Sequence, residues 1–349
     1  MKKIKIGNRT IGEGQPVFIT AEAGVNHNGK IDLAYKLIDA AVEAGCDAVK
    51  FQTFITEREI SKHAEKAEYQ KETTGKGESQ MEMVKKLELP QEDFKKLQDY
   101  ATKKGIMFYS AAFDFESVDT LDALNVPCYK IGSGEINNYP FLRYIAKKGR
   151  PIIFATGTSN IGEIEAALKV FHEEGIHDIL VYHCITRYPA PVETANLRAI
   201  NTIRTAFQEV TGLSDHTTGI TVPIAATALG IHAIEKHFTL DNNMEGPDHK
   251  ASLNPTDLKK MVKAIRDVES AMGTGKIERT KEEIEVAKVA RKSIVADTNI
   301  VKGTIITEKM ITYKRPGTGI EPKYLNFVIG KKAKQDIPED TLLAFSDLE

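Results

Sequence analysis

The chain has 349 residues, which is enough for one large domain and a small second one. Apolar residues make up 41% of it and aromatic residues 7%, so a large hydrophobic core of ordinary composition is expected. Lysine and arginine number 47 against 49 acidic residues, a formal net charge of -2. This balance argues against nucleic acid as the main partner, although a local cationic pocket for a small anion remains compatible with it.

The cysteines and the first residues indicate a compartment. Cys46, Cys128 and Cys184 lie far apart and form no CxxC motif, which predicts buried free thiols and a reducing environment. The start, Met1-Lys2-Lys3, is not followed by the apolar stretch of a signal peptide. No apolar run approaches the roughly 18 residues that a membrane span needs. We therefore expect a cytoplasmic protein without a membrane partner.

Strand-like and helix-like segments alternate along most of the chain. Residues 4–12 predict a small hairpin that turns at Gly7-Asn8. Helical segments with apolar residues three and four positions apart separate the later strands. The strand-like runs cover residues 17–22, 48–54, 107–113, 128–132, 151–156, 179–184, 211–216 and 232–238. The pattern predicts a (β/α)8 barrel, and the lack of a glycine-rich nucleotide fingerprint after the first strand disfavours the alternative, an open doubly wound sheet.

The same pattern predicts how the chain divides. We expect the hairpin and the barrel to form a catalytic domain over residues 1–275, followed by a charged linker at 276–286. Short β-like runs then predict a separate small domain over 287–349. A polar insertion at 55–89 interrupts the barrel after its second strand. At the carboxyl end of a barrel strand, such an insertion is either a lid over the active site or a solvated loop.

Two histidines end neighbouring strands that a single helix connects. His216 follows G-L-S-D, and His237 follows I-E-K. Neighbouring parallel strands point their carboxyl ends the same way, and alternation puts Ser214 with His216 on one face and Glu235 with His237 on one face. Two imidazoles placed in this way can hold one divalent metal ion. Two unrelated core histidines are the alternative.

Two lysines end other strands, Lys50 the second and Lys130 the fourth. An unpaired buried ammonium group is costly, so each lysine needs a partner. They could converge on a phosphate or carboxylate, with the hydroxyls of Ser133 and Ser214 as further donors. A Schiff-base lysine of an aldolase and an internal ion pair with a carboxylate are the alternatives. Two lysines beside a pair of metal-binding histidines fit an anionic substrate better than imine chemistry, which needs only one lysine.

Two carboxylates accompany these lysines. Glu22 ends the first strand, and Glu135 lies in the loop after the fourth. Each is a candidate for proton transfer or for positioning water, and each could instead be a structural partner of a lysine. The isolated histidines His27, His183 and His249 are expected to be orienting or structural groups rather than ligands.

Eight motifs follow one another in the order found in one known enzyme family. They read A-E-A-G-V-N-H-N-G (21–29), V-K-F-Q-T-F (49–54), K-I-G-S-G-E-I-N-N-Y-P (130–140), H-C…Y-P-A-P (183–191), L-S-D-H (213–216), E-K-H-F-T-L-D (235–241), G-P-D-H-K-A-S-L (246–253) and K-R-P-G-T-G-I (314–320). On these motifs the whole chain resembles the bacterial sialic acid synthases, which make N-acetylneuraminate and related nonulosonates such as legionaminate. Its last part resembles their antifreeze-like (SAF) domain.

The resemblance implies a (β/α)8 barrel with a C-terminal SAF domain of the β-clip type. It implies a homodimer in which the SAF domain covers the partner's active site. The implied reaction condenses phosphoenolpyruvate with N-acetylmannosamine, releases phosphate and gives N-acetylneuraminate. The alternative within the class uses 2,4-diacetamido-2,4,6-trideoxymannose and gives N,N'-diacetyllegionaminate. A barrel that binds carbohydrate without catalysis is the alternative from another class.

The resemblance also assigns residues by position. It implies that His216 and His237 bind the metal, Mn2+ with Mg2+ or Co2+ as alternatives. It implies contacts to phosphoenolpyruvate from Lys50, Lys130, Ser133, Thr186 and Ser214, and contacts to the sugar from Gln52, Tyr188, Asp248 and Arg315. Glu22 and Glu135 match the acidic residues of the site.

Two departures from the family pattern stand near the predicted site. The third strand reads S-A-A-F-D where the family usually has S-T-P-F, so Ala111 lacks a hydroxyl expected to touch phosphate. The sixth strand end carries Thr186-Arg187, where an amide and a variable residue are frequent. Arg187 either compensates in part for Ala111 or faces solvent.

Overall fold

The alternating segments fold into a closed parallel barrel, in a computed structural model that describes residues 2–75 and 77–349. The strands follow one another around the barrel in chain order, and the last strand, β10, pairs with both β9 and β3. The prediction of a (β/α)8 barrel is confirmed. The barrel strands are β3 (Phe18–Gly24), β4 (Ala48–Thr53), β5 (Met107–Ala112), β6 (Tyr129–Ile131), β7 (Ile152–Ala155), β8 (Ile179–Cys184), β9 (Val210–Asp215) and β10 (Ala233–His237).

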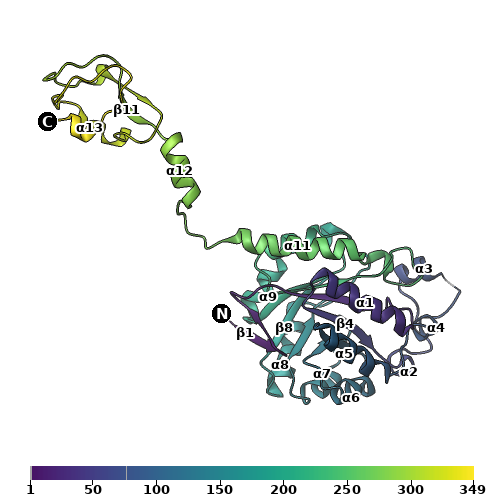
Figure 1. Ribbon diagram of the computed structural model, residues 1–349. Coiled ribbons are helices and arrows are strands. Elements are labelled where there is room, and N and C mark those ends of the chain that lie inside the picture. Colours follow the sequence, from purple (N-terminus) through teal and green to yellow (C-terminus); the bar gives the residue numbers. More distant parts are fainter. Residues whose placement is uncertain (1, 76) are drawn as a thin grey trace. The chain divides into compact units, whose positions relative to one another are not determined.

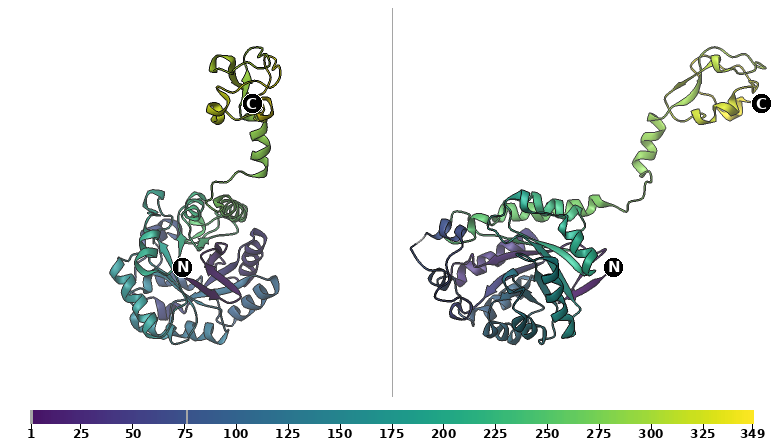
Figure 2. Two further views of the ribbon diagram at one scale, coloured as in Figure 1. Left: turned by 90° about the vertical axis from the view of Figure 1, so that its left-hand side faces the viewer. Right: turned by 180° about the vertical axis from the view of Figure 1, so that it is seen from behind.

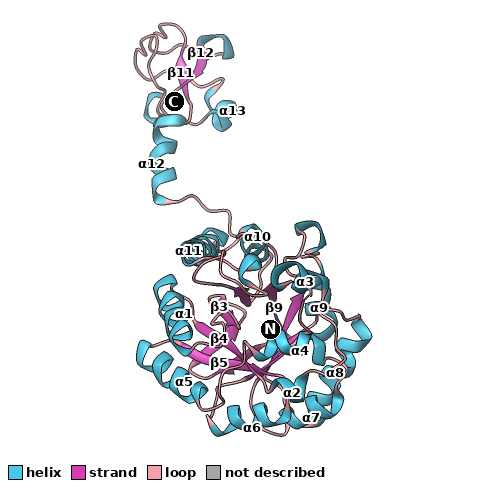
Figure 3. Ribbon diagram, turned by 90° about the vertical axis from the view of Figure 1, so that its right-hand side faces the viewer, coloured by secondary structure: helices cyan, strands magenta, loops and turns pink. Residues whose placement is uncertain are grey.

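A ring of helices surrounds these strands (Figures 1 and 3). All residues of β3 and β8 are buried, because the helices cover one face of each strand and the barrel interior covers the other. Of the helices in the described residues, none is long and apolar enough to cross a membrane. The ring consists of α1 (Ile31–Ala44), α5 (Asp93–Lys104), α6 (Phe115–Ala123), α7 (Tyr139–Ala146), α8 (Ile161–Glu173), α9 (Ala199–Phe207), α10 (Thr221–Ala228) and α11 (Pro255–Met272).

Local signals set the ends of several helices. Asn160 and Glu163 form a capping box at the start of α8, and Asp114 caps α6 by accepting from the Ser117 N–H. Gly45 ends α1 with φ 82°, in the left-handed region that a residue without Cβ adopts most easily. These caps satisfy backbone groups that the helix itself leaves without partners.

The N-terminal hairpin closes the amino end of the barrel. Strands β1 (Lys3–Ile6) and β2 (Arg9–Gly12) pair antiparallel, as predicted. Their buried side chains Ile4, Ile6 and Ile11 join one apolar cluster with barrel residues such as Phe18 and Tyr109. The hairpin therefore leaves the opposite, carboxyl end of the strands as the end where a functional site is expected.

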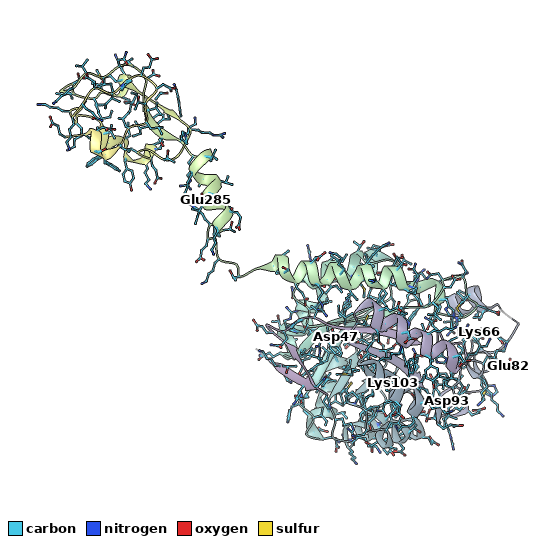
Figure 4. All side chains as sticks on the ribbon, in the orientation of Figure 1. Asp47, Lys66, Glu82, Asp93, Lys103 and Glu285 are labelled. Carbon is cyan, nitrogen blue, oxygen red and sulfur yellow. The ribbon has the colours of Figure 1, made fainter. Side chains whose placement is uncertain are left out.

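The insertion after β4 folds into short helices, α2 (Thr56–Glu59), α3 (Glu68–Thr74) and α4 (Gln80–Lys85). Its centre is the buried side chain of Lys66, labelled in Figure 4, whose Nζ donates to Thr74 Oγ1 at 2.9 Å and to Glu78 Oε1 at 3.1 Å. A buried, multiply bonded lysine fixes the surrounding backbone. The described part of the insertion is therefore structured, which disfavours the solvated-loop alternative.

The chain divides into two compact units, Met1–Gly273 and Thr274–Glu349. Figure 2 shows each unit from two further sides. The second unit contains α12 (Lys281–Ala290), β11 (Ser293–Ala296), β12 (Ile311–Lys314) and α13 (Leu325–Val328). Strands β11 and β12 pair antiparallel over a small core that includes Ile294, Ile306 and Leu343. Helix α12 begins within the stretch 276–286 that the sequence assigns to a linker.

His27 predicts a pH dependence of stability. It is 1% exposed, its Nδ1 accepts from the Gly29 N–H at 3.1 Å, and burial lowers its pKa from 6.5 to about 4. As the pH falls, His27 is therefore protonated in the unfolded chain before it is protonated in the folded protein. The stabilisation from neutral His27, about 3 kcal/mol, is present above pH 6.5 and is lost between pH 6.5 and 4.

We expect His27→Phe to flatten the fall of the unfolding free energy over this pH range, as measured by urea denaturation. The control is His63→Phe, which replaces an exposed histidine. Parallel curves for the wild type and His27→Phe would contradict the assignment.

Candidate active site

The carboxyl ends of the barrel strands surround a cavity of about 170 Å³. Larger hollows exist, and in the one at the amino end two charged groups are engaged in the fold: Arg204 with the Gly230 carbonyl and Glu269 with Arg266. The carboxyl-end cavity is instead lined by most of the predicted site residues: Glu22, Lys50, Gln52, Lys130, Ser133, Thr186, Tyr188, Ser214, His216 and His237. Residues up to 215 positions apart thus meet in one place, because each ends a strand or begins the loop after it.

Two lysines and two glutamates form the floor of this cavity. Lys50 Nζ lies 3.2 Å from both Glu22 Oε1 and Glu235 Oε1, and Lys130 Nζ lies 3.1 Å from the same oxygen of Glu235. Ser214 Oγ donates to that oxygen at 3.3 Å. All four charged groups are buried, so their Coulomb interactions are only weakly screened by water.

The two carboxylates differ in their proton affinity. Burial raises the pKa of Glu22 to about 7, against the influence of Lys50. Burial also opposes ionisation of Glu235, but the ammonium groups of Lys130 and Lys50 outweigh it and lower its pKa to about 2. Glu235 is therefore the fixed counter-ion of the lysines, while Glu22 can exchange a proton near neutral pH.

Glu235 is the main site residue that sequence reasoning missed. The alternation along β10 already placed it on the face of His237, yet only the histidine was assigned a role. The available signal was the spacing: residues two positions apart on a strand face the same side, so a carboxylate two positions before His237 also faces the cavity. The second Oε atom of Glu235 is buried and has no hydrogen-bond partner in the described residues, so it is available to a ligand.

A second missed position is Gly157, which follows β7. Its N–H donates to Ser133 Oγ at 2.9 Å. A Cβ at this position would lie 1.9 Å from Thr186 Oγ1 and 2.6 Å from Ser133 Oγ, so only glycine fits between the two hydroxyls. With Lys130 on the neighbouring strand, these groups form a cluster of donors that suits an anion.

The two histidines lie side by side at the cavity wall. Their ring centroids are 5.2 Å apart. Nδ1 of His216 lies 2.7 Å from the Ile185 carbonyl, which can only accept, so this nitrogen carries the proton, and in the neutral ring Nε2 carries the lone pair. Burial opposes protonation of this ring, but Cys184 and the Ile185 carbonyl outweigh burial and raise its pKa. Nδ1 of His237 is buried, has no hydrogen-bond partner in the described residues and lies 3.9 Å from Asp248 Oδ2. Burial holds the pKa of His237 well below its usual value, so this ring is neutral.

This donor set fits a divalent metal ion, because neutral imidazoles with free lone pairs are the form that binds metal. In the described residues no three His, Cys, Asp or Glu side chains are assembled as ligands. Substrate or water would therefore complete the coordination, as in a site with open positions.

Aromatic rings extend the site toward its mouth. Tyr188 lies over His216 with ring centroids 4.0 Å apart and meets His237 edge-on at 5.4 Å. Tyr69, from helix α3 of the insertion, stacks on Tyr188 at 5.3 Å. The insertion therefore contacts the mouth of the cavity, which favours the lid alternative. Asp248 lies nearby, and burial raises its pKa to about 6.

Some predicted residues lie elsewhere. Glu135 ends the short 3-10 helix Ser133–Glu135, is half-exposed and accepts from Asn138 Nδ2 at 2.7 Å. One turn of this helix points Ser133 into the cavity and Glu135 away from it, so the structure does not support a catalytic Glu135. Arg315 is exposed and belongs to the second unit.

The two departures from the family pattern lie in different surroundings. Ala111 lines the cavity. Arg187 is exposed, which favours the alternative that Arg187 faces solvent.

Known proteins are similar to this chain over nearly its whole length. Residues 37–277 match the NeuB family, and residues 291–349 match the SAF domain. The N,N'-diacetyllegionaminic acid synthase of Campylobacter jejuni is 48% identical over 93% of this chain and 98% of its own length. The enzyme of the same name from Legionella pneumophila is 41% identical over 98% of each chain.

A solved structure shares the fold over most of this chain. The N-acetylneuraminic acid (sialic acid) synthetase of Leptospira borgpetersenii, solved in complex with citrate, is 34% identical, with a TM-score of 0.73 over 82% of this chain and 95% of that one. The fold and the site thus define a barrel enzyme of the nonulosonate synthase class with a C-terminal SAF domain. The chain belongs to the NeuB family.

Proposed function

We propose that this enzyme condenses phosphoenolpyruvate with the open-chain form of 2,4-diacetamido-2,4,6-trideoxymannose, to give N,N'-diacetyllegionaminate and phosphate. The observation that carries the reaction type is the buried Lys50–Glu235–Lys130 cluster beside the paired histidines. One anionic reactant and one reactant with an electrophilic carbonyl carbon can be held there together.

The cationic and hydroxyl groups bind phosphoenolpyruvate. Lys130, Ser133 and Thr186 line the space for its phosphate, and Lys50 with Ser214 faces its carboxylate. The Gly157 N–H holds the Ser133 hydroxyl in place. Both lysines pair with Glu235. For Lys50, burial opposes the charge, but the carboxylates of Glu22 and Glu235 outweigh burial and raise the pKa, which favours the ammonium form over the free amine that an imine would need. For Lys130, burial outweighs Glu235 and lowers the pKa. Fixed donors of this kind orient C3 of phosphoenolpyruvate toward the second substrate.

His216 and His237 would hold the divalent metal, for which we propose Mn2+. When bound, the metal supplies Lewis-acid polarisation of the aldehyde oxygen of the sugar. Tyr188 limits access of water above the rings, and Gln52 and Asp248 lie where sugar hydroxyl or amide groups would be received.

The reaction balances as one phosphoenolpyruvate, one sugar and one water giving one nonulosonate and one phosphate. C3 of phosphoenolpyruvate forms the new bond to the aldehyde carbon, water adds at C2, and the C2–O bond to phosphate breaks. Glu22, 3.2 Å from Lys50 and 3.1 Å from the Gln52 amide, is the carboxylate placed to position that water and take its proton.

The choice of sugar rests on the relatives. Two enzymes named for N,N'-diacetyllegionaminic acid are 48% and 41% identical to this chain, whereas the N-acetylneuraminic acid synthetase is 34% identical. The test is phosphate release from phosphoenolpyruvate with either sugar, with Mn2+ and after EDTA treatment. We expect release with the trideoxy sugar, little release with N-acetylmannosamine, and loss of activity in EDTA that Mn2+ restores. Preference for N-acetylmannosamine would assign the enzyme to the other branch, and release that EDTA does not affect would contradict the metal.

Tyr69 predicts a contribution from the insertion. Because its ring extends the Tyr188–His216 stack toward the mouth, Tyr69→Ala should open the sugar side of the site. We expect the KM for the sugar to rise about tenfold while the KM for phosphoenolpyruvate stays unchanged, since one aromatic contact is worth about 1 kcal/mol or more. Tyr139→Ala, on helix α7, is the control. Equal increases in both KM values would show a general loss of structure instead.

We also propose the homodimer that the resemblance implies, with Arg315 acting in the partner's site. Mixing Arg315→Ala with His237→Ala protein should then restore activity, because a mixed dimer contains one site with both residues intact. Size-exclusion chromatography gives the oligomeric state independently. No recovery on mixing, with subunit exchange verified by differently tagged chains, would place Arg315 outside the partner's site.

A further inference from the structure

The strands that carry the two histidines also carry a buried ion pair on their other face. Lys236 and Asp215 are direct partners in the register of β10 and β9. Side chains alternate along a strand, so Lys236 points away from the cavity that His237 faces. Lys236 is 0% exposed and Asp215 is 3% exposed, and Nζ of Lys236 donates to Asp215 Oδ2.

This pair fixes the chain on both sides of His216. The carboxylate of Asp215 accepts from the backbone N–H and from the hydroxyl of Thr217, both at 3.0 Å. Nζ of Lys236 also donates to the Thr217 carbonyl. Asp215 and Thr217 flank one histidine, and Lys236 precedes the other. The hydrogen bonds therefore tie the backbone at His216 to the backbone at His237.

Stability alone does not explain such a pair. Removing an ammonium and a carboxylate group from water is expensive, and apolar residues of similar volume often stabilise a protein equally well or better. Directed hydrogen bonds differ from apolar contacts because they define one geometry. Asp215 directly precedes His216, and Lys236 directly precedes His237. The geometry of the pair therefore affects the placement of both imidazoles in the cavity.

We propose that Lys236, Asp215 and Thr217 are positioning residues that hold the rings of His216 and His237 at the separation which one divalent metal ion requires. The inference rests on the proposed function, because the metal belongs to it. The residues act through the backbone and do not touch a substrate.

The experiment measures Mn2+ affinity of the metal-free full-length protein by electron paramagnetic resonance of free Mn2+, without turnover. We expect Lys236→Met to raise the Kd about tenfold or more, in the range found when outer partners of metal ligands are removed. Thr217→Val removes only one hydroxyl and should raise the Kd severalfold. The control is Arg266→Met, which breaks an ion pair to Asp47 at the amino end of the barrel and should leave the Kd unchanged.

A double variant separates positioning from stability. Asp215→Leu/Lys236→Met replaces the ion pair by an apolar pair, so its Tm should recover relative to Lys236→Met while its Mn2+ affinity stays low. If Lys236→Met does not fold, Thr217→Val and the double variant carry the test. Variants that fold and bind Mn2+ like the wild type would overturn this inference and leave the proposed function intact. A wild-type protein that binds no Mn2+ would overturn the metal site and the inference together.

Discussion

His237→Ala is expected to lose measurable Mn2+ binding and to lower kcat by at least about 10³-fold. In the proposed mechanism the metal would polarise the reacting carbonyl, a contribution of several kcal/mol, and one imidazole is a weak ligand by itself. The ring of His237 is neutral and its Nδ1 has no protein hydrogen-bond partner in the described residues, so the substitution removes a ligand and no structural bond of that nitrogen. Mn2+ titration and initial rates measure the two effects.

A buried histidine on the same sheet provides the control for this variant. His183 lies on β8 and bonds to the Ala195 carbonyl through Nε2 at 2.9 Å. We expect His183→Ala to lower Tm and to keep Mn2+ affinity. Unchanged turnover in His237→Ala would remove the basis for a histidine-bound metal.

The second large effect is expected for Lys130→Met, which should lower kcat/KM for phosphoenolpyruvate by at least about 10²-fold. Truncating one member of a buried, hydrogen-bonded charge pair costs about 2–5 kcal/mol. The fold should survive, because Lys50 and Ser214 continue to contact Glu235. Steady-state kinetics at varied phosphoenolpyruvate concentration measure the loss.

The control for Lys130→Met is Lys148→Met, whose lysine pairs with Asp119 at 2.7 Å in the helical layer. We expect its kcat/KM to match that of the wild type. If Lys130→Met changed only the KM for the sugar, the assignment of the anion site would be incorrect.

The sequence was sufficient for the barrel because its signals are local and repeated. Strand-like runs such as 179–184 coincide with β8, and alternation with helices leaves few topologies. The convergence of Lys50, Lys130, Ser214, His216 and His237 followed from the rule that carboxyl ends of barrel strands meet. The approach of Lys50, Lys130 and Ser214 to Glu235 Oε1 within 3.3 Å is a finding of the structure.

The remaining features depend on geometry that sequence spacing does not specify. Glu135 lies two residues after Ser133, and only the turn of the 3-10 helix shows that the two side chains diverge. Gly157 matters through two hydroxyls that follow the ends of other strands, Ser133 after β6 and Thr186 after β8. Tyr69 reaches Tyr188 because Lys66 organises the insertion, a contact between segments about 120 residues apart.

The most direct measurement of the condensation uses phosphoenolpyruvate labelled with 18O in the ester oxygen between C2 and phosphorus. Mass spectrometry of both products then shows which bond breaks. Water addition at C2 followed by departure of phosphate predicts that the label leaves in the phosphate and that the C2 oxygen of the sugar acid comes from solvent. Label retained at C2 of the product would mean that the P–O bond breaks, and would contradict the mechanism assigned to this cavity.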